Sequence, residues 1–233
     1  MSYIERLNEL KIWLDETRGD KLEEMGAFFD RRIETYEEHM SRWCGHYKWM
    51  AAVLPEEAER VLDIGVGTGL ELDEIYKRFP LLDVTCIDLS EEMLRVLAEK
   101  HGHRNIHIMR GDYFTHDLGE NYDAIIAFET LHHFTTERKT ELFRRLRYAL
   151  SDGGVFIECD YIAETQEIED LLFSESRRRR KRDMIAPDAF VHFDTPLTIE
   201  HEMAAISAAG FSKVELIGFL PGDDGTAMIR ATK

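Results

Sequence analysis

Short apolar runs alternate with amphipathic stretches from Arg60 onward, and no other feature of the sequence limits the fold so strongly. Apolar runs that predict strands lie at 61–64, 83–87, 106–109, 124–128 and 155–158. Amphipathic stretches that predict helices lie at 70–78, 91–100, 137–150 and 198–209. This alternation implies right-handed crossovers, so we expect an α/β fold, a doubly wound and mainly parallel sheet with helices on both faces.

Two further strand-like runs, at 213–219 and 226–232, are joined by a turn-rich linker that begins Pro221-Gly222-Asp223. A linker this short leaves no room for a helix, so the two strands must pair antiparallel. The sheet should therefore have seven strands and end in an antiparallel hairpin strand, unlike an ordinary dinucleotide-binding sheet.

The segment before this pattern reads as helical, because apolar residues recur near helical spacing through residues 2–54, with breaks at Gly19-Asp20 and Cys44-Gly45. We therefore expect an N-terminal helical cap at 1–54. A main domain should follow at 55–233, with an insert or lid at about 162–196.

The composition limits the size of the domain, the location of the protein and the kinds of cysteine site that it can contain. The 233 residues are 44% hydrophobic, which suits one α/β domain with a small appendage. No apolar run is long enough for a membrane helix and residues 1–18 lack a secretory signal, so a cytoplasmic location without membrane contact is expected. Cys44, Cys86 and Cys159 lie far apart, which argues against a disulfide framework, a cysteine metal site or an iron–sulfur cluster.

The strand at 61–64 runs into alternating glycines, Gly65, Gly67 and Gly69, with Asp63 near the strand end. Glycines let a loop turn tightly and bring its backbone against a ligand, and amides at the start of the following helix face that ligand. An acid beside a pyrophosphate would place two anions in one low-dielectric site. Asp63 instead suits a phosphate-free cation, and S-adenosylmethionine carries both an ammonium group and a sulfonium.

Acidic residues also end the next two predicted strands. Asp88 follows Asp63 by 25 positions, near the place where an acid accepts from ribose hydroxyls, although it could instead belong to the start of the helix that Ser90 caps. Asp112, followed by Tyr113, could accept from an adenine amino group or could be a turn aspartate.

The fourth predicted strand ends in Phe128-Glu129-Thr130-Leu131-His132-His133, beside the expected topological switch point. His132, His133 and Glu129 are therefore candidates for a general base. Neighbouring histidines without a third ligand make no metal site, so no metal is expected.

These segments together resemble the class I S-adenosylmethionine-dependent methyltransferases of the small-molecule type, which have a Rossmann-like fold. VLDIGVGTG is similar to the glycine-rich motif of the family, IDLSEEML to its ribose motif, RGDYF to its adenine-side motif, YDAIIAFETLHHF to its fourth strand and LSDGGVFIECD to its fifth. The resemblance covers about residues 58–233.

The resemblance implies S-adenosyl-L-methionine as cofactor and a transferred methyl group. It implies a set of cofactor-binding residues at the motif positions, namely Asp63, Gly65, Val66, Gly67, Thr68, Gly69, Asp88, Leu89, Met93, Asp112, Tyr113, Phe128 and Glu129. It also makes Phe29, Tyr36 and Met40 lid candidates, with Tyr36 near the cofactor, and it places Phe190, His192 and Phe193 at the acceptor pocket.

The acceptor expected is a small molecule, and a homodimer is left open. Asn-Pro-Pro-Tyr is absent from the fourth strand and no cysteine lies in a nucleophilic motif, which disfavours methylation of DNA bases or glutamine. An RNA-modifying enzyme, a carboxy-S-adenosylmethionine-type enzyme and a non-catalytic regulator remain alternatives. A nicotinamide oxidoreductase is disfavoured by Asp63 and by the terminal hairpin.

A formal net charge of −17 disfavours nucleic acid, yet six consecutive cations interrupt the acidic balance. They are Arg177, Arg178, Arg179, Arg180, Lys181 and Arg182. A solvated, charge-segregated helix is the simpler interpretation, because acids open this segment and cations end it. Contact with an anionic acceptor, RNA or an acidic partner is the functional alternative.

Overall fold

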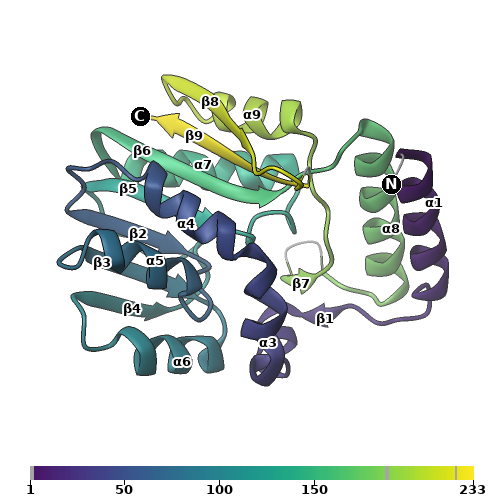
Figure 1. Cartoon of the computed structure of the whole chain (residues 1–233). Helices are drawn as coiled ribbons and strands as arrows, with labels where there is room; N and C mark the ends of the chain where they lie inside the picture. Colours follow the sequence, from purple (N-terminus) through teal and green to yellow (C-terminus); the bar gives the residue numbers. More distant parts are fainter. Residues whose placement is uncertain (1–2, 187–188, 224) are drawn as a thin grey trace.

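The computed structural model describes residues 3–186, 189–223 and 225–233. It contains a seven-stranded sheet in the order β4-β3-β2-β5-β6-β9-β8 (Figure 1). The strands are β2 (Arg60–Ile64), β3 (Asp83–Asp88), β4 (Ile106–Arg110), β5 (Tyr122–Phe128), β6 (Leu150–Tyr161), β8 (Lys213–Phe219) and β9 (Thr226–Thr232). Strands β2 to β6 pair in parallel, and β9 is antiparallel to both β6 and β8. The predicted fold class is confirmed.

Each face of the sheet is covered because buried residues alternate along its strands. On one face, Val61 and Ile126 pack toward α4 (Cys44–Val53), α5 (Leu70–Arg78) and α6 (Glu91–His101). On the other, Leu62 and Ile125 pack toward α7 (Thr136–Ala149) and α9 (Ile199–Ala208). These two cores fix the edge at which the parallel strands end.

Strand β6 is longer than the sequence predicted. It begins at Leu150 and runs through Gly153, because the backbone resumes pairing with β5 after a register shift between Tyr122 and Ala124. The extension also carries the strand to Asp160 and Tyr161, beyond the predicted end at residue 158.

The N-terminal segment is helical over most of its length, as α1 (Tyr3–Glu16), α2 (Met25–Asp30), α3 (Ile33–Met40), η1 (Ser41–Trp43) and α4. Its fully helical prediction was wrong at Glu23 and Glu24, which form strand β1 and pair antiparallel with β7 (Val191–His192). The two-stranded sheet lies at the end of the large sheet (Figure 1). A pairing between segments this far apart leaves no periodic signal in either one.

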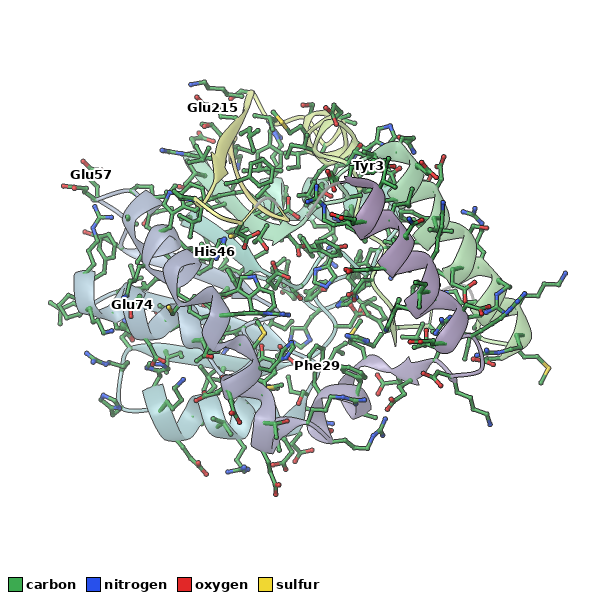
Figure 2. The ribbon with its side chains drawn as sticks, turned by 45° about the vertical axis from the view of Figure 1, so that its right-hand side comes forward. Tyr3, Phe29, His46, Glu57, Glu74 and Glu215 are labelled. Atoms are coloured by element: carbon green, nitrogen blue, oxygen red, sulfur yellow. The ribbon has the colours of Figure 1, made fainter. Side chains whose placement is uncertain are left out.

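Helix α8 (Gln166–Arg182) lies beside α1, and Leu7 and Leu14 pack against Ile168 and Leu172 (Figure 1). Tyr3, labelled in Figure 2, begins α1 and donates to Glu167 Oε2 at 2.9 Å. Among the described residues, no helix has the length and apolar character needed to cross a bilayer.

The basic run ends α8, as the simpler interpretation expected, but it is less solvated than that interpretation implied. Arg179 is 4% exposed and donates to Glu175 Oε1 at 2.7 Å and to Thr17 Oγ1 at 2.8 Å. Arg182 donates to the carbonyls of Arg18 and Asp20 near the end of α1. These cations hold the N-terminal segment against the insert.

Arg179→Ala should therefore lower the free energy of unfolding by about 2–3 kcal/mol, because it removes a buried cation and leaves Glu175 with one partner fewer. Arg177→Ala, in the same run but exposed, is the matched control and should change it by less than about 0.5 kcal/mol. Urea unfolding of the two variants checks the difference, and equal effects would contradict it.

Candidate active site

The loops that follow β2 and β5 meet at one edge of the sheet. Crossovers leave β2 toward β3 on one side, while β5 lies on its other side, so the switch point falls between β2 and β5. Gly65 has φ +70°, and a Cβ added there would lie 2.1 Å from Thr130 Oγ1. The glycine-rich loop therefore fits closely against the loop after β5.

A cavity of about 50 Å³ opens at this edge. The predicted cofactor residues that line it are Tyr36, Gly65, Gly67, Asp88, Leu89, Met93, Tyr113, Phe128 and Glu129. Met25, Gly26, Phe29, Thr130, His133 and Phe190 complete the lining. Most of the predicted cofactor set is thus gathered around one space, with aromatic rings on several sides.

Four other predicted cofactor residues do not line the cavity and belong to the structure of the loops around it. Val66 and Thr68 are buried, and Gly69 caps α5 with φ +72°. Asp112 accepts from the Phe114 amide at 2.7 Å, as the alternative of a turn aspartate expected.

Asp63 also lies outside the lining. Its side chain is fully buried in β2, and neither carboxylate oxygen has a hydrogen-bond donor among the described residues. Burial, with Glu71 nearby, raises the pKa of Asp63 well above its usual range, and burial raises the pKa of Glu71 to about 7. Asp63 and Glu71 thus form a buried carboxyl pair, and direct contact of Asp63 with a cation stays a prediction.

Asp88 does line the cavity. Its Oδ2 accepts from the Gly67 amide at 2.9 Å and its Oδ1 from the Ser90 amide at 2.8 Å. Ser90 caps α6 through the Met93 amide, so Asp88 does belong to the helix start, and its contact with ribose stays a prediction. A carboxylate has about four acceptor sites, so two remain for ribose hydroxyls.

The N-terminal segment closes the cavity from the opposite side. Tyr36 on α3 places its hydroxyl 3.0 Å from the point that a Cβ on Gly67 would occupy. Phe29 on α2, labelled in Figure 2, lies edge-on to Tyr36 with ring centroids 6.0 Å apart. The third lid candidate, Met40, is buried in the core beside α4 and lines the neighbouring cavity.

That second cavity, of about 1000 Å³, shares Phe29, Tyr36, Glu129 and His133 with the first. Its wall also includes His132, Tyr161, His192 and Asp194. The shared residues mark the place where two bound molecules would meet.

His132 is bound to a buried acid that the sequence analysis did not select. Its Nδ1 lies 2.5 Å from Asp160 Oδ1, and the other oxygen of Asp160 accepts from the Leu131 amide at 2.8 Å. Burial opposes charge on the ring, but the attraction and hydrogen bond of Asp160 outweigh it and raise the pKa of His132 to about 9. His132 and Asp160 thus form an ion pair at neutral pH.

The other two candidate bases differ from His132. Burial, reinforced by the positive charge of His132, lowers the pKa of His133 well below its usual value. Burial raises the pKa of Glu129 to about 8 despite the nearby His132. Glu129 has φ +47°, which is strained for a non-glycine residue, and it accepts from Thr226 Oγ1 at 3.1 Å.

Asp194 was also missed by the sequence analysis. Its carboxylate joins His132 and His133 in a cluster whose possible ligand atoms lie within 4.8 Å of one another. The premise that these histidines lack a third neighbour was therefore wrong. No spacing rule links residue 194 to residue 132, because the insert brings them together; Asp160, two residues beyond a predicted strand, could have been found from the alternation of β6.

A family model described as a methyltransferase domain matches residues 61–154. The chain is 28% identical over 209 residues to a sterol 24-C-methyltransferase of Gibberella zeae, covering 87% of this chain and 50% of that protein. The chain therefore spans half the length of this curated relative.

Solved structures share the fold. Human N-acetylserotonin methyltransferase, in complex with S-adenosylmethionine, is similar with a TM-score of 0.64 and 20% identity, over 87% of this chain and 55% of that one. DesVI of Streptomyces venezuelae is similar with a TM-score of 0.63 and 18% identity, over 85% of this chain and 97% of that one. Residues 61–154 thus match a methyltransferase domain, and the seven-stranded sheet around them has the fold of S-adenosylmethionine-dependent methyltransferases.

Proposed function

We propose that this protein transfers a methyl group from S-adenosylmethionine to an oxygen atom of a small-molecule acceptor. The observation that carries the proposal is the imidazole of His132, held by buried Asp160 in the wall of a cavity that adjoins the glycine-loop cavity. Nitrogen acceptors need no such base when they arrive as free amines, whereas a hydroxyl must lose its proton.

Three features of the first cavity, which adjoins the larger second one, favour the cofactor. Gly65 and Gly67, both with positive φ, present backbone rather than side chain to it. Asp88 offers acceptors for ribose hydroxyls, and Tyr113 and Phe29 offer flat apolar surface for a purine. Asp63 and Glu71 are two buried acids beside the loop, and Asp63 has no hydrogen-bond donor among the described residues, so the pair favours a positively charged ligand.

The raised pKa values of Asp63 and Glu71 predict how the preference for a positively charged ligand changes with pH. A carboxyl whose folded pKa exceeds its unfolded value stabilises the fold below the unfolded pKa, and that contribution is lost as pH rises through the folded pKa, here about 7 for Glu71. A bound cation offsets this loss of stability, and S-adenosylmethionine carries a sulfonium charge that S-adenosylhomocysteine lacks. The ratio of the Kd of S-adenosylhomocysteine to that of S-adenosylmethionine should therefore rise about three- to tenfold between pH 6 and pH 8.

Calorimetric titration at the two pH values measures this ratio. Glu71→Gln should flatten its pH dependence, whereas Glu74→Gln, which changes a half-buried acid that pairs with Lys77 on the same helix, should not. A ratio that stays constant in the wild-type protein would remove the electrostatic role of the pair.

Bound in the first cavity, the cofactor supplies a methyl group activated by positive charge on sulfur. The chain positions the acceptor oxygen in the second cavity. His132 takes the acceptor proton at Nε2 in the fraction of molecules whose ring has lost its own Nε2 proton, and this fraction grows as the pH rises toward the raised pKa of His132. The oxygen lone pair forms the new C–O bond, and the pair of the broken C–S bond stays on sulfur. Asp160 then faces an imidazolium ion, whose charge it stabilises.

Of the three candidate bases, we assign the proton to His132. Burial holds the pKa of His133 well below its usual value, which makes it the weaker base, and its Nδ1 faces both the Phe193 carbonyl and Asp194 Oδ1 at 3.4 Å. Glu129, shared by both cavities, is placed to orient the acceptor against the cofactor. We also propose that residues 1–54 and 162–196 act as the cap and lid of the two cavities.

The test begins with binding of S-adenosylhomocysteine by calorimetry, with NADH as the contrasting ligand. Transfer of labelled methyl is then measured with phenolic, amine and carboxylate acceptors, a metabolite extract and an RNA pool. Label in hydroxylated compounds supports the proposal. Label only in amines or RNA, or binding without transfer in every pool, would replace it with one of the alternatives that the sequence left open.

A further inference from the structure

The insert closes one side of His132 through its backbone. The Thr195 amide donates to the His132 carbonyl at 2.7 Å, and the Phe193 carbonyl lies 3.4 Å from His133 Nδ1. Asp194 stands between these two contacts, so the position of its backbone relative to His132 is fixed on both sides.

The carboxylate of Asp194 faces imidazole nitrogens. Its Oδ1 lies 3.6 Å from His132 Nε2, 3.4 Å from His133 Nδ1 and 4.0 Å from His192 Nε2. This oxygen is buried and has no hydrogen-bond donor in the described part of the chain, although the side chain as a whole is 45% exposed. A buried anionic oxygen is costly without positive charge beside it, so the charge that balances it needs an explanation.

A metal ion and an imidazolium ion are the two candidates. A metal would need a lone pair from His133 Nδ1, but that nitrogen faces the Phe193 carbonyl oxygen and carries a proton if the two are to attract. An imidazolium at His132 needs an acceptor at each ring nitrogen. Asp160 stands at Nδ1 and Asp194 at Nε2, which is the arrangement found.

We propose that Asp194 is a positioning residue for His132: in the unliganded protein it pairs with the Nε2 side of the protonated ring, and the acceptor hydroxyl takes this place when it binds. The catalytic meaning rests on the proposed function, whereas the pairing itself does not. Because Asp194 belongs to the insert, this pairing makes the protonation of the base depend on the position of the insert.

Other titratable or charged groups also lie around His132 and could influence its protonation. They are Asp160 and Tyr161 from β6, Glu129 from the end of β5, neighbouring His133, His192 from β7, and Lys139 of α7, which lies close to Asp160. Only Asp194 and Asp160 carry a carboxylate within 3.6 Å of a ring nitrogen of His132 among the described residues.

The test measures the protonation of His132 as a function of pH. Nuclear magnetic resonance of the histidine ring nitrogens monitors it in the unliganded full chain, and the His132→Asn variant identifies which signal belongs to His132. In Asp194→Asn the titration midpoint of His132 should fall by about one pH unit, as for removal of one nearby opposite charge. Asp223→Asn is the matched control, since Asp223 lines the same cavity but faces His46, and it should leave the midpoint unchanged.

Methyl transfer supplies the second readout. The acid limb of the pH profile of kcat/KM should shift to lower pH together with the His132 midpoint. For each protein, kcat/KM at pH 7 is divided by its limiting value at high pH, and this fraction should be up to about tenfold larger in Asp194→Asn than in the wild type. A purely structural role would lower the rate at every pH and leave the limb in place. An unchanged His132 midpoint in a folded variant, or loss of the ring signals on adding Zn²⁺ alone at equimolar concentration, would overturn the pairing; absence of methyl transfer with a shifted midpoint would sink only the proposed function.

Discussion

Asp160→Asn should bind S-adenosylhomocysteine as the wild-type protein does and lose about 10²–10⁴-fold in kcat, the usual contribution of a positioned general base. The carboxylate of Asp160 accepts from His132 Nδ1 and thereby keeps the Nε2 lone pair directed away from β6. An asparagine amide can present its nitrogen instead and favour the wrong tautomer. The pKa of His132 should also fall, because the attraction that raises it is gone.

Single-turnover transfer of labelled methyl measures this loss. His132→Asn combined with Asp160→Asn should lose little more than either change alone, since the two residues act as a unit. Asp152→Asn, an exposed change on the same strand, should leave kcat unaltered. A fully active Asp160→Asn variant would mean that the acceptor reaches the cofactor without this base.

Gly65→Ala should abolish measurable cofactor binding and lower the free energy of unfolding by about 3 kcal/mol. The added Cβ would lie 2.1 Å from Thr130 Oγ1 and 2.7 Å from Thr130 Cβ, so one of the two loops must move. The positive φ of +70° adds about 1 kcal/mol for a residue with a side chain. Movement of either loop displaces the floor of the first cavity.

Gly153→Ala separates the two contributions. Gly153 has φ +79°, but nothing lies within 4 Å of an added Cβ, so this variant should lose only about 1 kcal/mol and keep cofactor binding. Chemical unfolding and calorimetry with S-adenosylhomocysteine give both quantities. Similar losses in the two variants would show that backbone conformation, and not the contact with Thr130, controls the loop.

Local patterns predicted the sheet well, because strand and helix periods are written into each segment. Apolar alternation placed β2, β3 and β5 within two residues of their observed bounds. The same patterns gathered Asp88, Tyr113 and Glu129 at one edge, since parallel strands end together. What they could not fix was the burial of each side chain: Asp63 comes just before the right loop, but it is fully buried and does not line the first cavity.

Contacts between distant segments were beyond sequence reasoning. Asp194 reaches His132 only because the insert returns over the sheet edge, and the strand at Glu23 and Glu24 exists only because β7 supplies its partner. From the sequence alone, the basic run could be a surface that binds anions. In the structure two of its arginines donate to the backbone carbonyl of Arg18, just after α1. Each of these outcomes depends on where another part of the chain lies.

The pairing of β1 with β7 has a consequence for the order of events during synthesis. Glu23 leaves the ribosome about 170 residues before its partner His192, so β1 must wait, unpaired, while the whole sheet between them is made. Closing so long a loop is entropically expensive unless the intervening domain has already brought its ends together. The roof over the two cavities should thus be the last part to assemble, and nascent chains that stall before residue 191 should be cut readily by protease within their first thirty residues.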